Sequence, residues 1–119
     1  MSTRTFALGL ALVFAIGCDG ESEVDCSTVK TFTEVQGALN KCTACHSSAL
    51  TELTSRGDAP HAPLEYNYDS FVEASKFPEK ASATLGEEAA IPMPPATDPQ
   101  LSPQELTDLR TWFECDTPQ

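Results

Sequence analysis

The sequence predicts an all-α fold, in which short helices alternate with long loops. A helical apolar stripe lies in the first half of the chain and a capped helical face lies near its end. No segment shows sustained period-two alternation of β-branched residues, which is the pattern of a strand. The 119 residues, 40% hydrophobic and 21% charged, suit one small globular domain with an extension outside it.

Residues 1–17 have the pattern of a signal peptide. Arg4 precedes an apolar run over residues 6–16, which is too short to span a bilayer core that needs about 20 residues. The run ends in Ala15-Ile16-Gly17-Cys18, which resembles a bacterial lipobox, where cleavage precedes a cysteine that receives the lipid. An ordinary secreted chain with a stray cysteine is the alternative. We expect a lipoprotein anchored through Cys18 to a bacterial membrane, facing the periplasm or the cell surface.

An acidic, polar stretch over residues 18–28 is expected to be a solvated tether, and residues 29–119 to form the domain. Cleavage would remove one arginine and no acidic residue, so the formal net charge would change from −11 to −12. This acidity argues against nucleic-acid binding, which depends on Lys and Arg meeting phosphate. Because the acidic residues are spread along the chain, attraction of basic partners and simple solubility both remain open.

The first predicted helix covers residues 31–42. Phe32, Val35 and Leu39 are spaced as one helical face, and Cys42 continues the series. The first cysteine of the central cluster therefore lies at the end of an amphipathic helix.

The middle of the domain predicts two short helices between loops. Residues 58–68 carry two prolines and read as a loop. A helix can open at residues 69–72, and it must stop before Phe77 because Pro78 disfavours helical geometry in the preceding residue. Pro78 can itself begin a second helix, with Gly86 as its C-terminal stop.

The last helix has the best-defined start. Ser102 is the expected N-cap, Pro103 stands at the first helical position, and Glu105 can reach back to complete a capping box. Leu101 and Leu106 occupy the two positions of a hydrophobic staple. The expected apolar face consists of Leu106, Leu109 and Phe113, with Trp112 beside it.

The segment KCTACH at residues 41–46 contains the residues that could form a redox site, a metal site or a cofactor attachment site. A redox C-x-x-C site would follow a strand, and here a helix precedes it. A zinc site needs four ligands, of which Cys42, Cys45 and His46 supply three, with His61 or Cys115 as the fourth. Adjacent Cys45 and His46 are awkward to aim at one tetrahedral ion. Covalent haem attachment uses C-x-x-C-H directly, with two thioether bonds and the histidine as an axial ligand.

Haem attachment is therefore the favoured interpretation, with one covalent haem c as the cofactor. The haem would also give this small domain a large apolar surface to pack around. The stretch IPMPPATDP offers Met93 as the second axial ligand, because the flanking prolines hold its backbone extended. Met93 as a core residue, or His61 as the distal ligand, are the alternatives.

The cysteine count leaves one further pair. With Cys18 assigned to lipid and two cysteines to haem, Cys26 and Cys115 remain, and an exported chain favours a disulfide between them. Such a bridge would contribute about 4 to 5 kcal/mol in the chain-entropy model. Two separate free thiols are the alternative.

Taken together, these residues resemble single-haem cytochrome c domains. The helix leading into Cys42-x-x-Cys45-His46, the Met93-Pro94-Pro95 loop and the capped helix with Trp112 are most similar to planctomycete-type cytochrome c domains, over residues 32–114. The resemblance implies a small fold wrapped around one haem, with thioethers at Cys42 and Cys45, His46 as proximal ligand and Met93 as distal ligand. It also implies that the first and last helices cross.

Two positions depart from this resemblance. Ser47 stands where a glycine often follows the histidine, and Cys115-Asp116 replaces a small-residue ending. Neither departure touches a haem ligand, and the second suggests a disulfide peculiar to this branch.

The expected function is electron transfer by a membrane-anchored cytochrome, with redox proteins as partners and no enzymatic activity, because both axial positions are filled. A haem enzyme or gas sensor with a labile sixth ligand is one rival. A haem-free binding module held by zinc or disulfides is the other.

Overall fold

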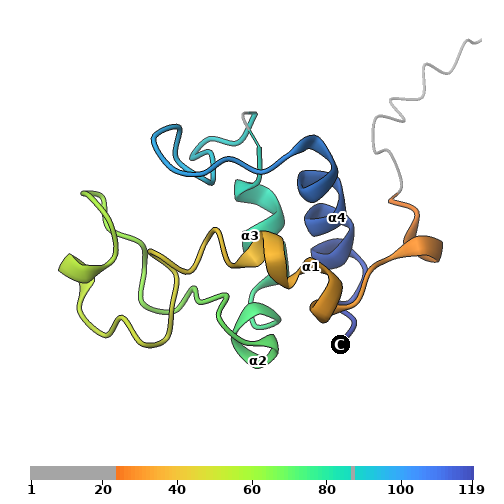
Figure 1. Ribbon diagram of the computed structural model, residues 1–119, viewed down its shortest axis with the longest axis horizontal. Helices are drawn as coiled ribbons and strands as arrows, with labels where there is room; N and C mark the ends of the chain where they lie inside the picture. The colour runs from red at the N-terminus through yellow and green to blue at the C-terminus, as the bar shows by residue number, and fades with distance from the viewer. Residues whose placement is uncertain (1–23, 87) are drawn as a thin grey trace, which may run out of the picture.

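The computed structural model describes residues 24–86 and 88–119. The predicted signal peptide, Cys18 and the tether as far as residue 23 lie outside the described residues. Within those ranges the chain is helical and has no β-strand, as Figure 1 shows. Over the same ranges, no helix is long and apolar enough to cross a membrane. The elements, in order, are η1 (Cys26–Thr28), α1 (Phe32–Leu39), η2 (Leu53–Ser55), α2 (Phe71–Ala74), α3 (Pro78–Thr84) and α4 (Pro103–Glu114).

Helix α1 begins with a cap that the apolar stripe does not reveal. The backbone N–H of Thr31 donates to Glu34 Oε2 at 2.8 Å, which satisfies one of the donors left free at a helix start. The helix ends at Leu39, three residues earlier than expected. Beyond it the chain continues in tighter turns, in which the N–H of Cys42 donates to the carbonyl of Leu39 at 2.9 Å. Cys42 is therefore half-buried although it lies outside the helix.

The two short middle helices are confirmed. Ser70 caps α2 by accepting a hydrogen bond from the N–H of Glu73 at 3.3 Å. Helix α3 begins at Pro78 and ends at Thr84. Gly86 follows with φ of +88°, a left-handed conformation that a glycine adopts without steric cost.

The capping box of α4 is also confirmed. Ser102 Oγ accepts from the N–H of Glu105 at 3.2 Å, and Glu105 Oε2 accepts from the N–H of Ser102 at 2.7 Å. The apolar face points into the molecule, because Leu109 and Trp112 are fully buried and Phe113 is nearly so. Helix α4 is the central element of the fold.

The core lies where α4 packs against α1 and α3 (Figure 1). Phe32 at the start of α1 lies 6.0 Å from Trp112 and 5.8 Å from Phe71 of α2, measured between ring centroids. This aromatic packing joins three helices. The buried members of the core are Val35, Ala38, Leu39, Ala74, Ala81, Leu85, Leu109, Trp112 and Phe113.

The two ends of the domain are tied together beside α1 and α4. Cys26 and Cys115 lie at disulfide distance, with the Cα atoms 5.6 Å apart. The carbonyl of Pro118 accepts from the N–H of Phe32 at 2.9 Å and from Trp112 Nε1 at 2.8 Å. The chain after α4 therefore folds back onto the start of α1.

Candidate functional site

The segment of Cys42, Cys45 and His46 leaves α1 in a compact turn. The N–H of Cys45 donates to the carbonyl of Cys42 at 3.2 Å, and the N–H of His46 donates to the same carbonyl at 2.9 Å. These bonds hold the two cysteines and the histidine on one turn of chain. Neither thiol is in a disulfide.

Both thiols of this turn are held in the protonated form. Burial raises the pKa of Cys42 to about 11, and the neighbouring Cys45 adds to the shift. The pKa of Cys45 is also raised, first by burial and then by the negative charges of Asp98 and Asp58. Asp58 and Asp98 come from two different loops, so both loops lie near the second cysteine.

The His46 ring is fixed by a backbone carbonyl. Its Nδ1 lies 2.9 Å from the carbonyl oxygen of Tyr66, which can only accept a hydrogen bond, so Nδ1 carries the proton. In the neutral ring this leaves Nε2 with a free electron pair. Burial lowers the pKa of His46 and the charge of Arg56 lowers it further, while the bond to Tyr66 acts in the opposite direction. Tyr68 packs beside the ring at a centroid distance of 5.3 Å.

Arg56 organises the loop behind His46, and the sequence did not single it out. Its side chain is 2% exposed and donates to backbone carbonyls around the loop, including that of Ser47 at 2.7 Å. Nη2 also donates to the side chain of Asn67. The remaining acceptors are the carbonyls of Leu50 at 2.8 Å, Pro63 at 2.5 Å and Tyr66 at 3.4 Å.

The position of Arg56 links it to His46. Tyr66 supplies one carbonyl oxygen to both the His46 ring and the Arg56 guanidinium. The only sequence signal for this role is that Arg56 is the sole lysine or arginine between residues 42 and 75. Most of its acceptors are main-chain atoms, which carry no residue-specific pattern.

Gly57 makes a close approach to the second cysteine. It has φ of +79°, and a Cβ at this position would stand 2.9 Å from the Sγ of Cys45. A side chain here would be strained by its backbone conformation and would also press on the sulfur. The glycine therefore keeps space open beside Cys45.

Met93 is anchored through its backbone to the end of α3. Its N–H donates to the carbonyl of Thr84 at 2.8 Å, and the pair Leu85 and Met93 forms an isolated parallel bridge. Arg110 of α4 donates to the carbonyl of Leu85 at 2.8 Å. The backbone of Met93 is therefore attached to the end of α3, which Arg110 connects to α4, and the Met93 side chain is half-buried.

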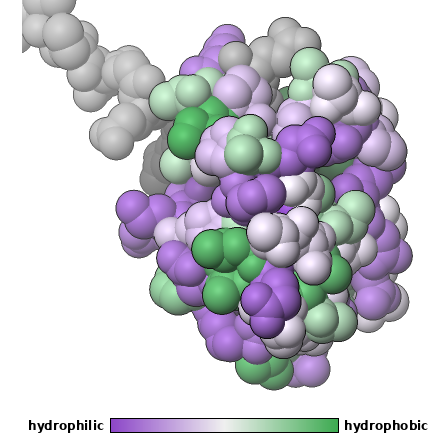
Figure 2. Space-filling model, turned by 90° about the vertical axis from the view of Figure 1, so that its left-hand side faces the viewer, coloured by the Kyte–Doolittle hydropathy of each residue, from purple (hydrophilic) through white to green (hydrophobic). Residues whose placement is uncertain are grey.

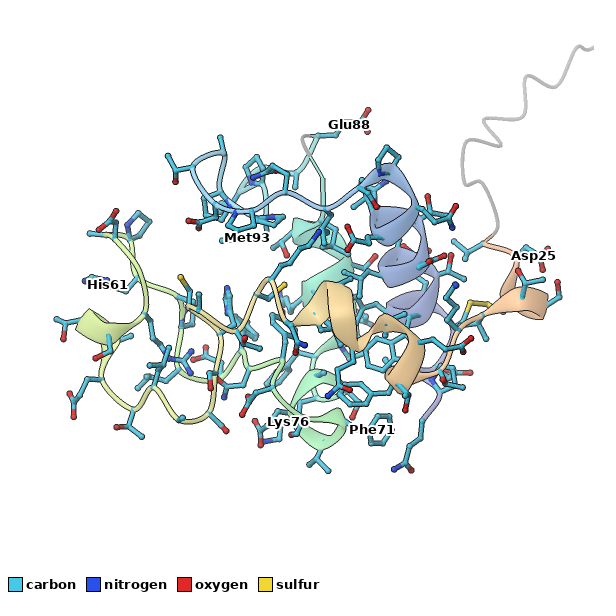
Figure 3. The ribbon with its side chains drawn as sticks, in the orientation of Figure 1. Asp25, His61, Phe71, Lys76, Glu88 and Met93 are labelled. Carbon is cyan, nitrogen blue, oxygen red and sulfur yellow. A yellow bond between two sulfur atoms is a disulfide. The ribbon has the colours of Figure 1, made fainter. Side chains whose placement is uncertain are left out.

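Figure 3 shows Met93 between its own loop and the ribbon that leads out of α1, whereas His61 lies apart on the outer loop. His61 Nδ1 is 2.7 Å from the carbonyl of Gly57. Of the two expected candidates for a fourth zinc ligand, Cys115 is paired with Cys26. In the part of the chain that the structure describes, no group of three or more His, Cys, Asp or Glu side chains is placed to hold a metal ion.

Comparison with known proteins finds no family model, no curated protein and no solved structure that matches this chain.

Proposed function

We propose that this chain is a lipid-anchored c-type cytochrome, in which residues 29–119 hold one covalent haem and transfer electrons. The observation that carries the proposal is the arrangement of two reduced thiols and a histidine on one turn, with Nδ1 of that histidine bound to a backbone carbonyl. Histidines that ligate metals commonly donate their other ring nitrogen in this way, because the bond fixes the ring and raises the basicity of the ligating nitrogen.

The donor set suits this cofactor. Cys42 and Cys45 would hold the haem through two thioether bonds, which form by addition of each S–H group across a vinyl group with no gain or loss of electrons. His46 Nε2 and the Met93 sulfur would ligate the iron. The bound haem supplies an iron that alternates between the ferric and ferrous states, and methionine ligation raises its reduction potential. Because protein atoms fill both axial positions, the proposed role is electron transfer without catalysis.

The test of the ligand set is an absorption spectrum of protein matured with a haem-attachment system. The haem colour should survive denaturation, because the attachment is covalent. The ferric protein should show a weak far-red sulfur-to-iron band, and Met93→Ala should lose it. His61→Ala is the matched control and should keep the band. A colourless product, or a band that Met93→Ala leaves unchanged, contradicts the ligand assignment.

Carbon monoxide separates the carrier from its rival, a haem enzyme or gas sensor with a labile sixth ligand. The ferrous parent should bind carbon monoxide slowly and weakly, because Met93 must leave first. Met93→Ala should bind it readily. Ready binding by the parent favours the rival.

The proposed anchor depends on Cys18. We expect Cys18→Ala to change processing and to move the exported protein from the membrane fraction to the soluble fraction, because the diacylglycerol has no sulfur to join. Fractionation followed by mass spectrometry of the N-terminal peptide measures both effects. A processed, monomeric variant that stays with the membrane would rule out the anchor.

A further inference from the structure

Lys41, the residue directly before Cys42, forms two long-range bonds to the other side of the candidate site. Its Nζ donates to the carbonyl of Gln100 at 3.1 Å and to Glu105 Oε2 at 2.8 Å. Gln100 ends the loop that begins at Met93, and Glu105 lies in the first turn of α4. One side chain therefore connects the cysteine turn to the far end of the methionine loop.

Gln100 organises the inside of that loop. Its Nε2 donates to the carbonyl of Pro95 at 2.7 Å and to the carbonyl of Asp98 at 2.8 Å. The N–H of Asp98 donates to the same Pro95 carbonyl at 2.9 Å. Residues 95–100 thus form a closed turn whose shape is held by the amide of Gln100.

The methionine loop is fixed at both of its ends. At one end, the N–H of Met93 is bound to the carbonyl of Thr84. At the other end, Lys41 binds the carbonyl of Gln100. The turn held by Gln100 lies between these two attachments. The distance from Met93 to the cysteine turn therefore depends on Lys41 and Gln100 as well as on α3.

We infer that Lys41 and Gln100 are positioning residues, which hold the Met93 loop in place across from Cys42 and His46. This inference rests on the proposed function, because its consequence is the strength of Met93 ligation to the haem iron. Neither residue supplies a ligand. Their contribution is to reduce the freedom of the loop, so that less conformational entropy is lost when the sulfur binds. A bond between a charged amine and a carbonyl or carboxylate is also among the stronger hydrogen bonds of a protein.

Lys41→Met is the variant that tests the inference. Methionine keeps much of the aliphatic stem and removes both bonds. Lys76→Met is the matched control, since Lys76 also forms a surface ion pair, with Glu73 at 2.6 Å, and lies well away from Met93 in Figure 3. Both variants change the net charge by the same amount. Gln100→Ala is a second test, which leaves Lys41 and the charge intact.

The measurement is the pH titration of the far-red sulfur-to-iron band in haem-loaded protein. In Lys41→Met and Gln100→Ala we expect the fraction of protein without Met93 ligation to rise by roughly tenfold at a given pH. That is the effect of losing either the charge-assisted bond from Lys41 to the loop carbonyl or the two neutral bonds of the Gln100 amide. If the band is lost as the pH is raised, weaker ligation should move the midpoint of that loss down by about one pH unit. Lys76→Met should titrate like the parent.

Amide hydrogen exchange gives a readout that does not involve the iron. Exchange at Asp98 should accelerate in Lys41→Met and Gln100→Ala, while exchange at Leu109 in the core should not change. If the band is present in the parent and lost in Met93→Ala, yet both loop variants titrate and exchange like the parent, the inference is wrong and the proposed function stands. If the parent has no such band, the ligand assignment fails instead. Should Lys41→Met fail to fold, Gln100→Ala decides.

Discussion

At the scale of single residues, Arg56 and Gly57 support the candidate site in different ways. Arg56 fills the loop behind His46 with hydrogen bonds, so a buried cation is balanced by carbonyl dipoles rather than by a carboxylate. Its planar, five-donor group suits this use, which a lysine with one nitrogen would not reproduce. Gly57 contributes by having no side chain beside Cys45.

Gly57→Ala should reduce stability. The alanine would have to adopt φ near +79°, which costs roughly 1 to 2 kcal/mol for a residue with a Cβ, and it would press on the Cys45 sulfur. Gly37→Ala is the control, because Gly37 lies within α1, is exposed, and has no atom within 4 Å of the added carbon. That change should stabilise the protein by roughly 0.5 to 1 kcal/mol. Urea unfolding measures both. A Gly57→Ala variant as stable as the parent would mean that the loop relaxes freely around the new side chain.

At the scale of elements, the start of α4 connects the packed helices to the loop that runs from Met93 to Gln100. Glu105 Oε2 accepts from the N–H of Ser102 and from Lys41 Nζ, so one carboxylate caps a helix and binds the residue before the cysteine turn. These hydrogen bonds, led by that of Lys41, lower the pKa of Glu105 below its usual value.

Glu105→Gln tests the charge of this carboxylate, since glutamine can still cap the helix. A carboxyl whose pKa is lower in the folded state stabilises the protein above its unfolded pKa of 4.5, and this stability is lost as the pH falls through the lowered value. At pH 7 we expect the variant to be less stable by at most about 1 kcal/mol, because the ion pair is partly exposed. The difference should shrink as the pH falls from 4.5 through the lowered pKa.

Glu65→Gln is the control. Because Glu65 is exposed, this change should alter stability little across the pH series. Denaturant unfolding at several pH values provides the comparison. A loss in Glu105→Gln that does not shrink as the pH falls would assign the effect to packing and not to charge.

Elements with local signals could be predicted from the sequence. The proline and capping residues of α2, α3 and α4 act within one turn, so their positions follow from the chain itself. The apolar stripe predicts an end for α1 three residues beyond the observed one, because the stripe continues through the tighter turn at Cys42. The site's supports could not be predicted in the same way. Lys41 bonds a carbonyl 59 residues away, and the partners of Arg56 are mainly backbone atoms.

At the scale of the whole molecule, the two sides of the domain are built differently. On one side, α1 and α4 pack together and the Cys26–Cys115 pair, 89 residues apart, closes the chain. On the other side, two long loops carry Gly57 and Met93. Figure 2 shows this loop side, where hydrophobic residues lie in small groups among hydrophilic ones. Leu53, Leu64 and Ile91 are exposed hydrophobic residues of these loops.

The charges of the loop side bear on how a redox partner would approach. Asp58 and Asp98 are 40 positions apart in the sequence, yet both raise the pKa of Cys45. Two acidic residues that are distant in the sequence thus lie close enough to Cys45 to act on its charge. Arg56 is the sole lysine or arginine of residues 42–75 and is buried. Lys41, directly before Cys42, is ion-paired with Glu105, while the lysines Lys30, Lys76 and Lys80 lie on or beside the helices. If the proposed function holds, Asp58 and Asp98 would attract a basic partner toward this side of the molecule.

Electron transfer to a basic single-haem partner should slow as salt is added. Steering by a charged surface raises encounter rates at low ionic strength by roughly 10-fold or more. Charges more than about 10 Å apart are largely screened at 0.1 M salt, so the gain must fade there. Stopped-flow rates across a salt series measure this dependence, and an acidic partner of similar potential should show the opposite slope.

Two double variants locate the attraction. Asp58→Asn with Asp98→Asn should flatten the salt dependence for the basic partner, because these carboxylates lie beside Cys45. Asp25→Asn with Asp108→Asn removes the same charge from a shallow hollow on the disulfide side, with Asp25 far from Met93 in Figure 3, and should leave most of the slope. Equal slopes in the two variants would mean that only the net charge matters. A rate that is flat in the parent would leave the acidic residues with solubility as their role, because attraction between charges cannot be independent of salt.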